Sequence, residues 1–314
     1  MTEREKQLFK HGVTLMKIAR DLVIKRVGDR LPTIEEYTRS LDISRGTVQA
    51  VLKLLQDKGC VVLHKRGHQG TFIEKIDIAK TWEYTNWAHL TGATELPLDT
   101  LAAGLATGVC LCMKQKSIPF NFAFMQGSRT RVRALLDHKY DFLITSELSA
   151  KVLINEGQDV QMIAKIEGCL YAEIYSLLFA EPGHEEIEDG MTIAYDPSSI
   201  DQTFLTNELT KDKKVNKIEL TYINTYESLK DGRADVIVCR PDVVRTGKYF
   251  QFHMKDIVLK DPTIPDANQL TYSVVLAAKN NYGLKELLLK NLDDKLISDV
   301  QQKVIRQEMA PSYY

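Results

Sequence analysis

The stretch from Leu31 to Gly59 constrains the fold of this chain more than any other part of the sequence. Within it, Thr33 stands three residues before Glu36, which is the spacing of a capping box at the start of a helix. This signal predicts a short helix over residues 34–41, followed at once by a turn.

A second helix follows over residues 45–58, because Ser44 is placed to cap it and Gly59 can close it in the left-handed conformation. Apolar residues at helical spacing predict its buried face: Val48, Val51, Leu52 and Leu55. Polar, small and basic residues remain outside that face: Arg45, Gly46, Thr47, Gln49 and Lys53. A short helix, a tight turn and a second helix of this kind make a helix-turn-helix.

A third helix and a hairpin complete the same domain. Apolar residues recur at helical spacing between residues 3 and 26. The runs at 61–63 and 71–73 are rich in β-forming residues, and a polar loop with glycines separates them, which predicts a hairpin. Three helices and a hairpin make a winged helix, and we place this domain at residues 1–76.

The charge of the chain is distributed unevenly. Residues 1–76 hold 15 Lys and Arg against nine Asp and Glu, a net charge of +6, whereas the whole chain has a net charge of −1. A basic N-terminal part joined to an acidic remainder suits nucleic acid at one end only. We therefore expect double-stranded DNA as a partner of the N-terminal domain.

The composition predicts a soluble protein of the cytoplasm with no membrane segment. No apolar run approaches the roughly 20 residues that span a bilayer, and the charged N-terminus lacks the apolar region of a signal peptide. The five cysteines are scattered, which favours reduced thiols.

The N-terminal motifs resemble those of the GntR-type winged-helix transcription regulators. The matching segments, within residues 12–74, are D-R-L-P-T, L-D-I-S-R-G-T-V-Q, K-G and G-T-F-I. The resemblance implies that the second helix and the wing contact DNA, and basic residues beside them suit phosphates. The candidate DNA-binding residues are Thr33, Ser44, Arg45, Thr47, Gln49, Lys53, Lys65, Arg66, Gly67, His68 and Gly70.

Two positions depart from that family's pattern. Glu35 occupies a place where family members usually carry an arginine that meets the DNA backbone, and a carboxylate there would repel phosphate. The wing loop, Gly67–Gly70, is also one residue longer than usual. We expect both departures to weaken or tilt DNA binding.

The remainder of the chain, residues 77–314, contains two βαβ units. The first is a strand at 120–125, a Gly-Ser turn, a helix, and a buried strand at 142–146. The second, about 90 residues later, is a strand at 218–223, a short helix and the run D-G-R-A-D-V-I-V-C-R. Two units of one design predict a bilobal α/β domain, so the whole chain is a multidomain α+β and α/β protein.

This pattern resembles the type 2 solute-binding-protein fold, in the form that LysR-type regulators use for effector sensing. The resemblance implies a first lobe of about 81–168 plus 272–314 and a second lobe of about 169–271. It also implies a ligand in the cleft between the lobes, at strand ends and helix N-termini that suit an anion. The candidate ligand-binding residues are Thr94, Glu95, Gly127, Ser128, Arg129, Thr145, Ser146, Ser198, Ser199, Arg240 and Asp242.

These observations favour a homodimeric transcription regulator controlled by a small anionic effector, without a cofactor. The sequence contains no Gly-x-Ser-x-Gly, P-loop, His-Glu-x-x-His or paired-cysteine metal motif, so we do not expect an enzyme. Two alternatives stay open: a winged helix that binds protein and not DNA, and an enzyme on the bilobal fold.

Overall fold

The structure is a computed structural model that describes residues 3–173, 175–241, 244, 251–257, 268–281 and 283–313, with the backbone alone over 3–9 and 268–269. The chain separates into two compact units, which we describe one at a time. One unit comprises Met1–Leu90, Met113–Phe120 and Tyr282–Asn291, and the other holds the rest. The domain limits inferred from the sequence remain a prediction.

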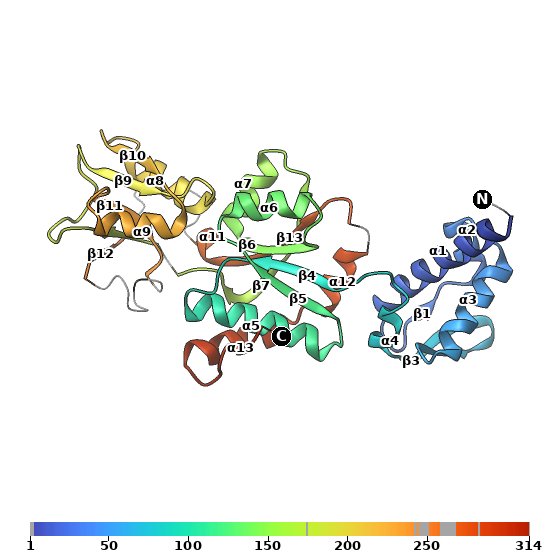
Figure 1. Cartoon of the computed structure of the whole chain (residues 1–314). Coiled ribbons are helices and arrows are strands. Elements are labelled where there is room, and N and C mark those ends of the chain that lie inside the picture. The colour runs from blue at the N-terminus through green and yellow to red at the C-terminus, as the bar shows by residue number, and fades with distance from the viewer. Residues whose placement is uncertain are drawn as a thin grey trace. The chain divides into compact units, whose positions relative to one another are not determined.

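The N-terminal unit contains the winged helix, as predicted. Its helices are α1 (Glu3–Val23), α2 (Ile34–Leu41), α3 (Arg45–Asp57) and α4 (Ile78–Trp82), and its small sheet has the order β1-β3-β2. The strands are β1 (Arg30–Leu31), β2 (Val61–Lys65) and β3 (Thr71–Ile76), with the short 3-10 turn η1 (Gly67–Gln69) in the wing. Figure 1 shows these elements at the blue end of the chain.

Local capping fixes the two helices of the helix-turn-helix. The predicted capping box is present, because the Thr33 side chain accepts a hydrogen bond from the Glu36 backbone N–H and the Glu36 carboxylate accepts one from Thr33. Ser44 caps α3 through the Thr47 N–H. The predicted stripe of α3 is fully buried or nearly so, and it packs with α1 and the hairpin in one apolar core.

The first lobe of the C-terminal domain is built on the sheet β5-β4-β6-β13-β7. Helices α6 and α7 lie on one face of this sheet and α5 and α13 on the other (Figure 1). The strands are β4 (Leu90–Thr94), β5 (Phe120–Phe124), β6 (Phe142–Ser146), β7 (Val160–Leu170) and β13 (Tyr272–Ala278). The helices are α5 (Thr100–Gln115), α6 (Ser128–Leu136), α7 (Glu147–Asn155), α11 (Asn268–Thr271) and α13 (Asp294–Ile305), while α12 (Leu284–Asn291) belongs to the other unit.

The second lobe is built on the sheet β10-β9-β11-β8-β12, in which β9 is parallel to β10 and β11 while β8 is antiparallel to both of its neighbours. The strands are β8 (Ser176–Phe179), β9 (Thr192–Tyr195), β10 (Asn216–Glu219), β11 (Val236–Cys239) and β12 (His253–Asp256), and the helices α8 (Ile200–Thr210) and α9 (Tyr222–Lys230) pack against β9 and β11. The strand predicted at 218–223 is wrong in its second half, because α9 begins at Tyr222.

Two sheets, each with its own helices, confirm the predicted bilobal α/β class. The chain returns to the first lobe at the end, where β13 pairs antiparallel with β6 and with β7. Over the described residues, no helix is both long and apolar enough to cross a membrane.

Candidate functional site

The predicted DNA-contacting side chains lie on the exposed parts of the winged helix. On α3, Arg45, Gln49 and Lys53 are exposed, and the Thr47 hydroxyl lies 2.9 Å from that of Ser44. The carboxylate of Glu35 on α2 forms a 2.8 Å ion pair with Arg45, and both side chains are more than half exposed. Glu35 therefore neutralises a guanidinium that the resemblance assigns to DNA.

The wing presents basic side chains beside a tight turn. Lys65 ends β2, and the guanidinium of Arg66 lies over the Phe72 ring at 4.6 Å from its centre. The wing closes through a hydrogen bond from the Arg66 N–H to the Gly70 carbonyl, and Gly70 has φ +100°, a conformation that favours glycine. His68 is exposed at the tip.

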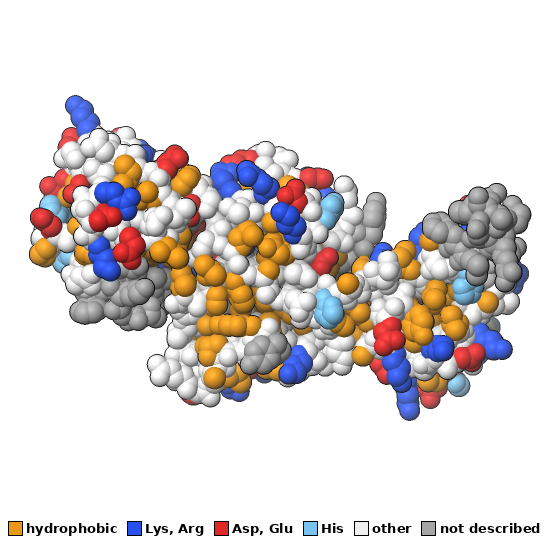
Figure 2. Space-filling view, in the orientation of Figure 1, with side chains coloured by type: hydrophobic (Ala, Val, Ile, Leu, Met, Phe, Trp, Pro, Cys, Tyr) orange, Lys and Arg blue, Asp and Glu red, His pale blue; other side chains and the backbone are white. Residues whose placement is uncertain are grey.

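The basic charge of the N-terminal domain is not gathered into one patch on the face that Figure 2 shows. Basic, acidic and hydrophobic side chains lie side by side there. No basic patch marks the candidate DNA-contacting surface in this view. The surface is assigned from the residue types and the exposure of α3 and the wing, and the Glu35–Arg45 ion pair joins α2 to α3.

In the C-terminal domain, the N-termini of α6 and α8 meet from opposite lobes. The Arg129 N–H donates to the Ser198 carbonyl at 3.0 Å, and the Ile200 N–H donates to the Ser128 hydroxyl at 3.2 Å. Gly127 has φ +81°, and a Cβ on it would lie 2.1 Å from the Ser198 hydroxyl oxygen. Only glycine fits at this position while the lobes touch.

Asp201 in the first turn of α8 is a buried carboxylate that crosses between the lobes. One of its oxygens accepts hydrogen bonds from the hydroxyls of Ser146 at 2.7 Å and Ser149 at 2.9 Å. Its other oxygen accepts one from the Tyr175 hydroxyl at 3.3 Å. Burial raises the pKa of Asp201 to about 6, although the two serine hydroxyls act in the opposite direction.

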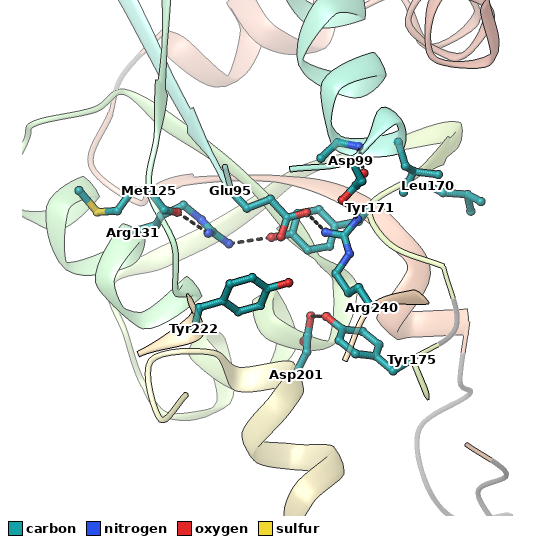
Figure 3. A network of polar contacts seen from close by, with 12 residues as sticks. Glu95, Asp99, Met125, Arg131, Leu170, Tyr171, Tyr175, Asp201, Tyr222 and Arg240 are labelled. Carbon is teal, nitrogen blue, oxygen red and sulfur yellow. Dashed lines mark hydrogen bonds and ion pairs between the residues drawn. The ribbon is translucent and has the colours of Figure 1, made fainter. Parts of the chain in front are cut away.

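Arg240, directly after β11, makes the second contact between the lobes. Its guanidinium pairs with the carboxylates of Glu95 and Asp99, the latter at 3.0 Å, and its side chain is only 3% exposed. Glu95 follows β4 and Asp99 precedes α5, so one guanidinium of the second lobe is held by two carboxylates of the first. Figure 3 shows this group together with Arg131, Asp201 and the neighbouring tyrosines.

Arg131 on α6 is buried at 2% exposure without a carboxylate ion pair among the described residues. Its two terminal nitrogens donate to the Met125 carbonyl and to the Tyr171 hydroxyl, each at 2.8 Å (Figure 3). Its Nε has no hydrogen-bond partner in the part of the chain that the structure describes. Burial raises the pKa of Tyr171, so this phenol is neutral and cannot compensate the charge.

These side chains surround a small cavity that we call the inner chamber, with a volume of about 20 Å³. A larger hollow of about 690 Å³, the outer chamber, adjoins it, and Gln126 and Tyr222 line both. The predicted residues that line the inner chamber are Glu95, Gly127, Ser128, Ser199 and Arg240, while Ser198 lines the outer one.

The other predicted ligand-binding residues lie elsewhere. Arg129 forms a surface ion pair with Glu156 at 2.6 Å, and Thr94 and Thr145 are buried at strand ends. Ser146 is not in the lining but holds Asp201. Asp242 lies outside the described residues.

The sequence did not single out seven other residues of the lining: Gln126, Arg131, Ser149, Tyr175, Asp201, Gln202 and Tyr222. One signal could have found Arg131, because it lies four residues after Gly127 on the inward face of α6, whereas Arg129 and Arg133 point to the more exposed side. In the described ranges, no group of three or more His, Cys, Asp or Glu is placed to hold a metal ion.

The fold and the site thus define a class of two-domain protein, in which a winged helix is joined to a bilobal α/β domain with a buried polar cleft. Residues 77–313 match the sequence family described as the YhfZ C-terminal domain, and the chain belongs to this family. Residues 26–73 match a family described as a helix-turn-helix domain.

The chain is also similar to individual proteins. The chain is 27% identical to the YhfZ protein of Escherichia coli (strain K12), over 97% of this chain and 98% of that one. The crystal structure of YhfZ from Shigella flexneri aligns with a TM-score of 0.58 at 24% identity, over 74% of this chain and 96% of that one. The aliphatic sulphonate binding protein SsuA from Escherichia coli, a periplasmic protein, aligns at 0.48 and 16% identity, over 70% and 75%.

Proposed function

We propose that this protein is a sequence-specific DNA-binding transcription regulator, controlled by a small-molecule effector bound in the cleft of its C-terminal domain. The observation that supports the first half is the exposed leading face of α3, with Arg45, Gln49 and Lys53, on a winged helix whose segment matches a helix-turn-helix family. The second half is supported by a polar cleft, closed by contacts from both lobes, with a buried guanidinium in its lining.

The proposal includes a cytoplasmic homodimer of the GntR type, as the motifs of the winged helix imply. Two recognition helices about 34 Å apart would read the halves of a palindromic site. The cleft binds its ligand and does not transform it, because Arg240 and Asp201 there are engaged in contacts that join the lobes. Sedimentation of the purified protein with and without a selected duplex would test the dimer.

DNA binding is best tested by the salt dependence of affinity. Each phosphate contact made by a basic side chain contributes about one unit to the slope of log K against log salt concentration. Fluorescence anisotropy of a labelled duplex between about 50 and 200 mM salt should therefore show a steep slope. Arg45→Ala should lower affinity for all sequences and reduce the slope by about one.

Glu35→Gln should have the opposite effect on DNA affinity from Arg45→Ala. Because the Glu35 carboxylate pairs with Arg45 at 2.8 Å, its removal should free the guanidinium and raise DNA affinity several-fold. Arg306→Ala, which removes an exposed guanidinium from the C-terminal domain, is the matched control. It should change neither the DNA affinity nor the slope of its salt dependence. Absence of salt-dependent binding would favour the alternative of a winged helix that binds protein.

A further inference from the structure

The charges of the inner chamber are unevenly compensated. Arg240 is held by two carboxylates, Glu95 and Asp99. Arg131, equally buried, contacts a carbonyl and a neutral phenol, and its Nε–H is directed to no acceptor among the described residues. A buried cation without a counter-charge and a buried donor without an acceptor both cost free energy, which an anionic ligand would recover.

The geometry of the guanidinium selects the kind of anion. Arg131 lines the inner chamber, and a guanidinium carries pairs of N–H groups on planar edges that match the two oxygens of a carboxylate. The inner chamber, at about 20 Å³, has room for one or two water molecules and so for carboxylate oxygens, but not for a ring. The body of a ligand must therefore lie outside this chamber.

The outer chamber supplies the space for that body. It has about 690 Å³ and adjoins the inner chamber at Gln126 and Tyr222, which line both. Its apolar walls are formed by Leu96, Pro197, Leu220 and Ile223. Side chains of this kind favour an apolar body over a sugar or a nucleotide.

The charged residues of the outer chamber argue against a second anionic group. Asp196 and Glu219 line it, and its described lining contains no lysine or arginine. A dicarboxylate reaching from Arg131 into this space would place its second charge near two carboxylates, which is repulsive. The ligand therefore carries a single negative charge.

We propose that the cleft binds a monocarboxylate with an apolar body, its carboxylate received by Arg131 and its body held in the outer chamber beside Ile223. This assignment rests on the proposed function, since it names the effector of the same cleft. The recognition is divided between the lobes, because Arg131 lies on α6 of the first lobe and Ile223 on α9 of the second.

The test is calorimetric titration of the full chain with a panel of aryl and branched-chain monocarboxylates, such as 3-phenylpropionate and 4-methylpentanoate. Each acid is paired with its primary amide, which has the same shape without the charge. At least one acid should bind more than tenfold more tightly than its amide, and acetate, which lacks a body, should bind at least tenfold more weakly than that acid. Equal affinities of acid and amide, or no binding by any acid of the panel, would overturn the proposal.

L-Phenylalanine separates a monoanion from a zwitterion. It differs from 3-phenylpropionate by an ammonium group, which would need one of the carboxylates of the cleft as its partner. Tighter binding of phenylalanine than of 3-phenylpropionate would overturn the assignment of a single negative charge.

Two variants locate the two parts of the ligand. Ile223 is 53% exposed, so Ile223→Asp should fold, and it should weaken binding of the selected acid at least tenfold without changing the weak binding of acetate. Leu289→Asp, at a side chain 51% exposed on α12, is the matched control and should bind normally. An unchanged affinity in Ile223→Asp would remove the outer chamber from the proposal.

Arg131→Lys keeps the charge but loses the planar edge, and should reduce the preference for acid over amide below threefold. Its fold is checked by circular dichroism and by retained salt-dependent DNA binding. If DNA binding is absent in the unmodified protein, the proposed regulator fails. If DNA binding is present but the acids bind no more tightly than their amides, only the ligand assignment fails.

Discussion

At the scale of single residues, Asp201 stands out because hydroxyl groups, and not a basic side chain, surround its buried carboxylate. Ser146, Ser149 and Tyr175 all donate to it, and burial raises its pKa to about 6. In the unfolded chain the same group titrates near 3.9. Between these values the folded chain holds a proton that the unfolded chain has released.

The folded state is therefore stabilised by this proton at low pH and loses that stabilisation as the pH rises from about 4 to about 6. Asp201→Asn has no such proton to lose. Relative to the unmodified protein, its free energy of unfolding should gain about 2–3 kcal/mol between pH 4 and pH 7.5. Chemical denaturation of both proteins at several pH values measures this difference.

An exposed carboxylate provides the control of opposite sign. The hydrogen bond from Arg233 lowers the pKa of Asp231, so this carboxylate stabilises the folded state above its unfolded pKa and ceases to do so as the pH falls. Asp231→Asn should therefore lose stability relative to the unmodified protein as the pH rises. A pH-independent difference for Asp201→Asn would show that its carboxylate is ionised throughout the range.

At the scale of elements, the packing of α5 on α13 depends on two glycines. A Cβ on Gly104 would lie 2.9 Å from backbone atoms of Gln301, and one on Gly108 would lie 2.8 Å from the Ile297 carbonyl oxygen. Gln301 is fully buried and ties the helices to the sheet, since its amide donates to the carbonyls of Leu101 and Leu170. The helices approach closely because neither glycine has a side chain.

Gly108→Ala should destabilise the C-terminal domain although alanine is the better helix former. The gain in helix propensity is about 1 kcal/mol, whereas overpacking against a backbone carbonyl costs about 1–3 kcal/mol. We expect a fall in Tm of about 2–6 °C by calorimetry. Gly12→Ala in the exposed interior of α1, where nothing lies within 4 Å, is the control and should raise stability. A Tm that rises in Gly108→Ala would mean that α13 can move away from α5.

Elements with local signals were predictable from the sequence, and those set by distant partners were not. Thr33 and Ser44 cap their helices through neighbours three residues away, so the pattern itself contains the contact. The same holds for Gly127 and Ser199, whose places at helix starts follow from a strand and a turn signal. The strand predicted at 218–223 ran into α9, because this run has β propensity that tertiary packing overrides.

The contacts in the cleft join residues that lie far apart in the sequence. The contact between Arg240 and Glu95 spans 145 residues, and that between Ser149 and Asp201 spans 52. Three arginines alternate along α6, and although the spacing of four residues from Gly127 favours Arg131, the orientation of the helix on its sheet decides which of them is buried. No spacing rule in the sequence identifies which charge is left without a counter-charge.

At the scale of the whole molecule, the contacts between the lobes come from groups that also line the inner chamber. Ser128 accepts a hydrogen bond from Ile200, and Glu95 pairs with Arg240, so one set of residues both joins the lobes and lines the inner chamber. A ligand in the chamber therefore has different contacts in closed and open lobes, which is the differential affinity that a change of population requires.

The proposed control of DNA binding by this cleft leads to a quantitative prediction that involves both domains. If the selected carboxylate changes the affinity for DNA by some factor, DNA must change the affinity for the carboxylate by the same factor, because the two bindings share one coupling free energy. Couplings of this kind typically amount to about 5–150-fold. Anisotropy with saturating carboxylate and calorimetry with saturating duplex should give equal factors, and Arg131→Lys should bring both toward one. If the protein binds both DNA and the carboxylate but neither changes the affinity for the other, the cleft is not coupled to the winged helix. That result would contradict the role of the cleft as the effector site.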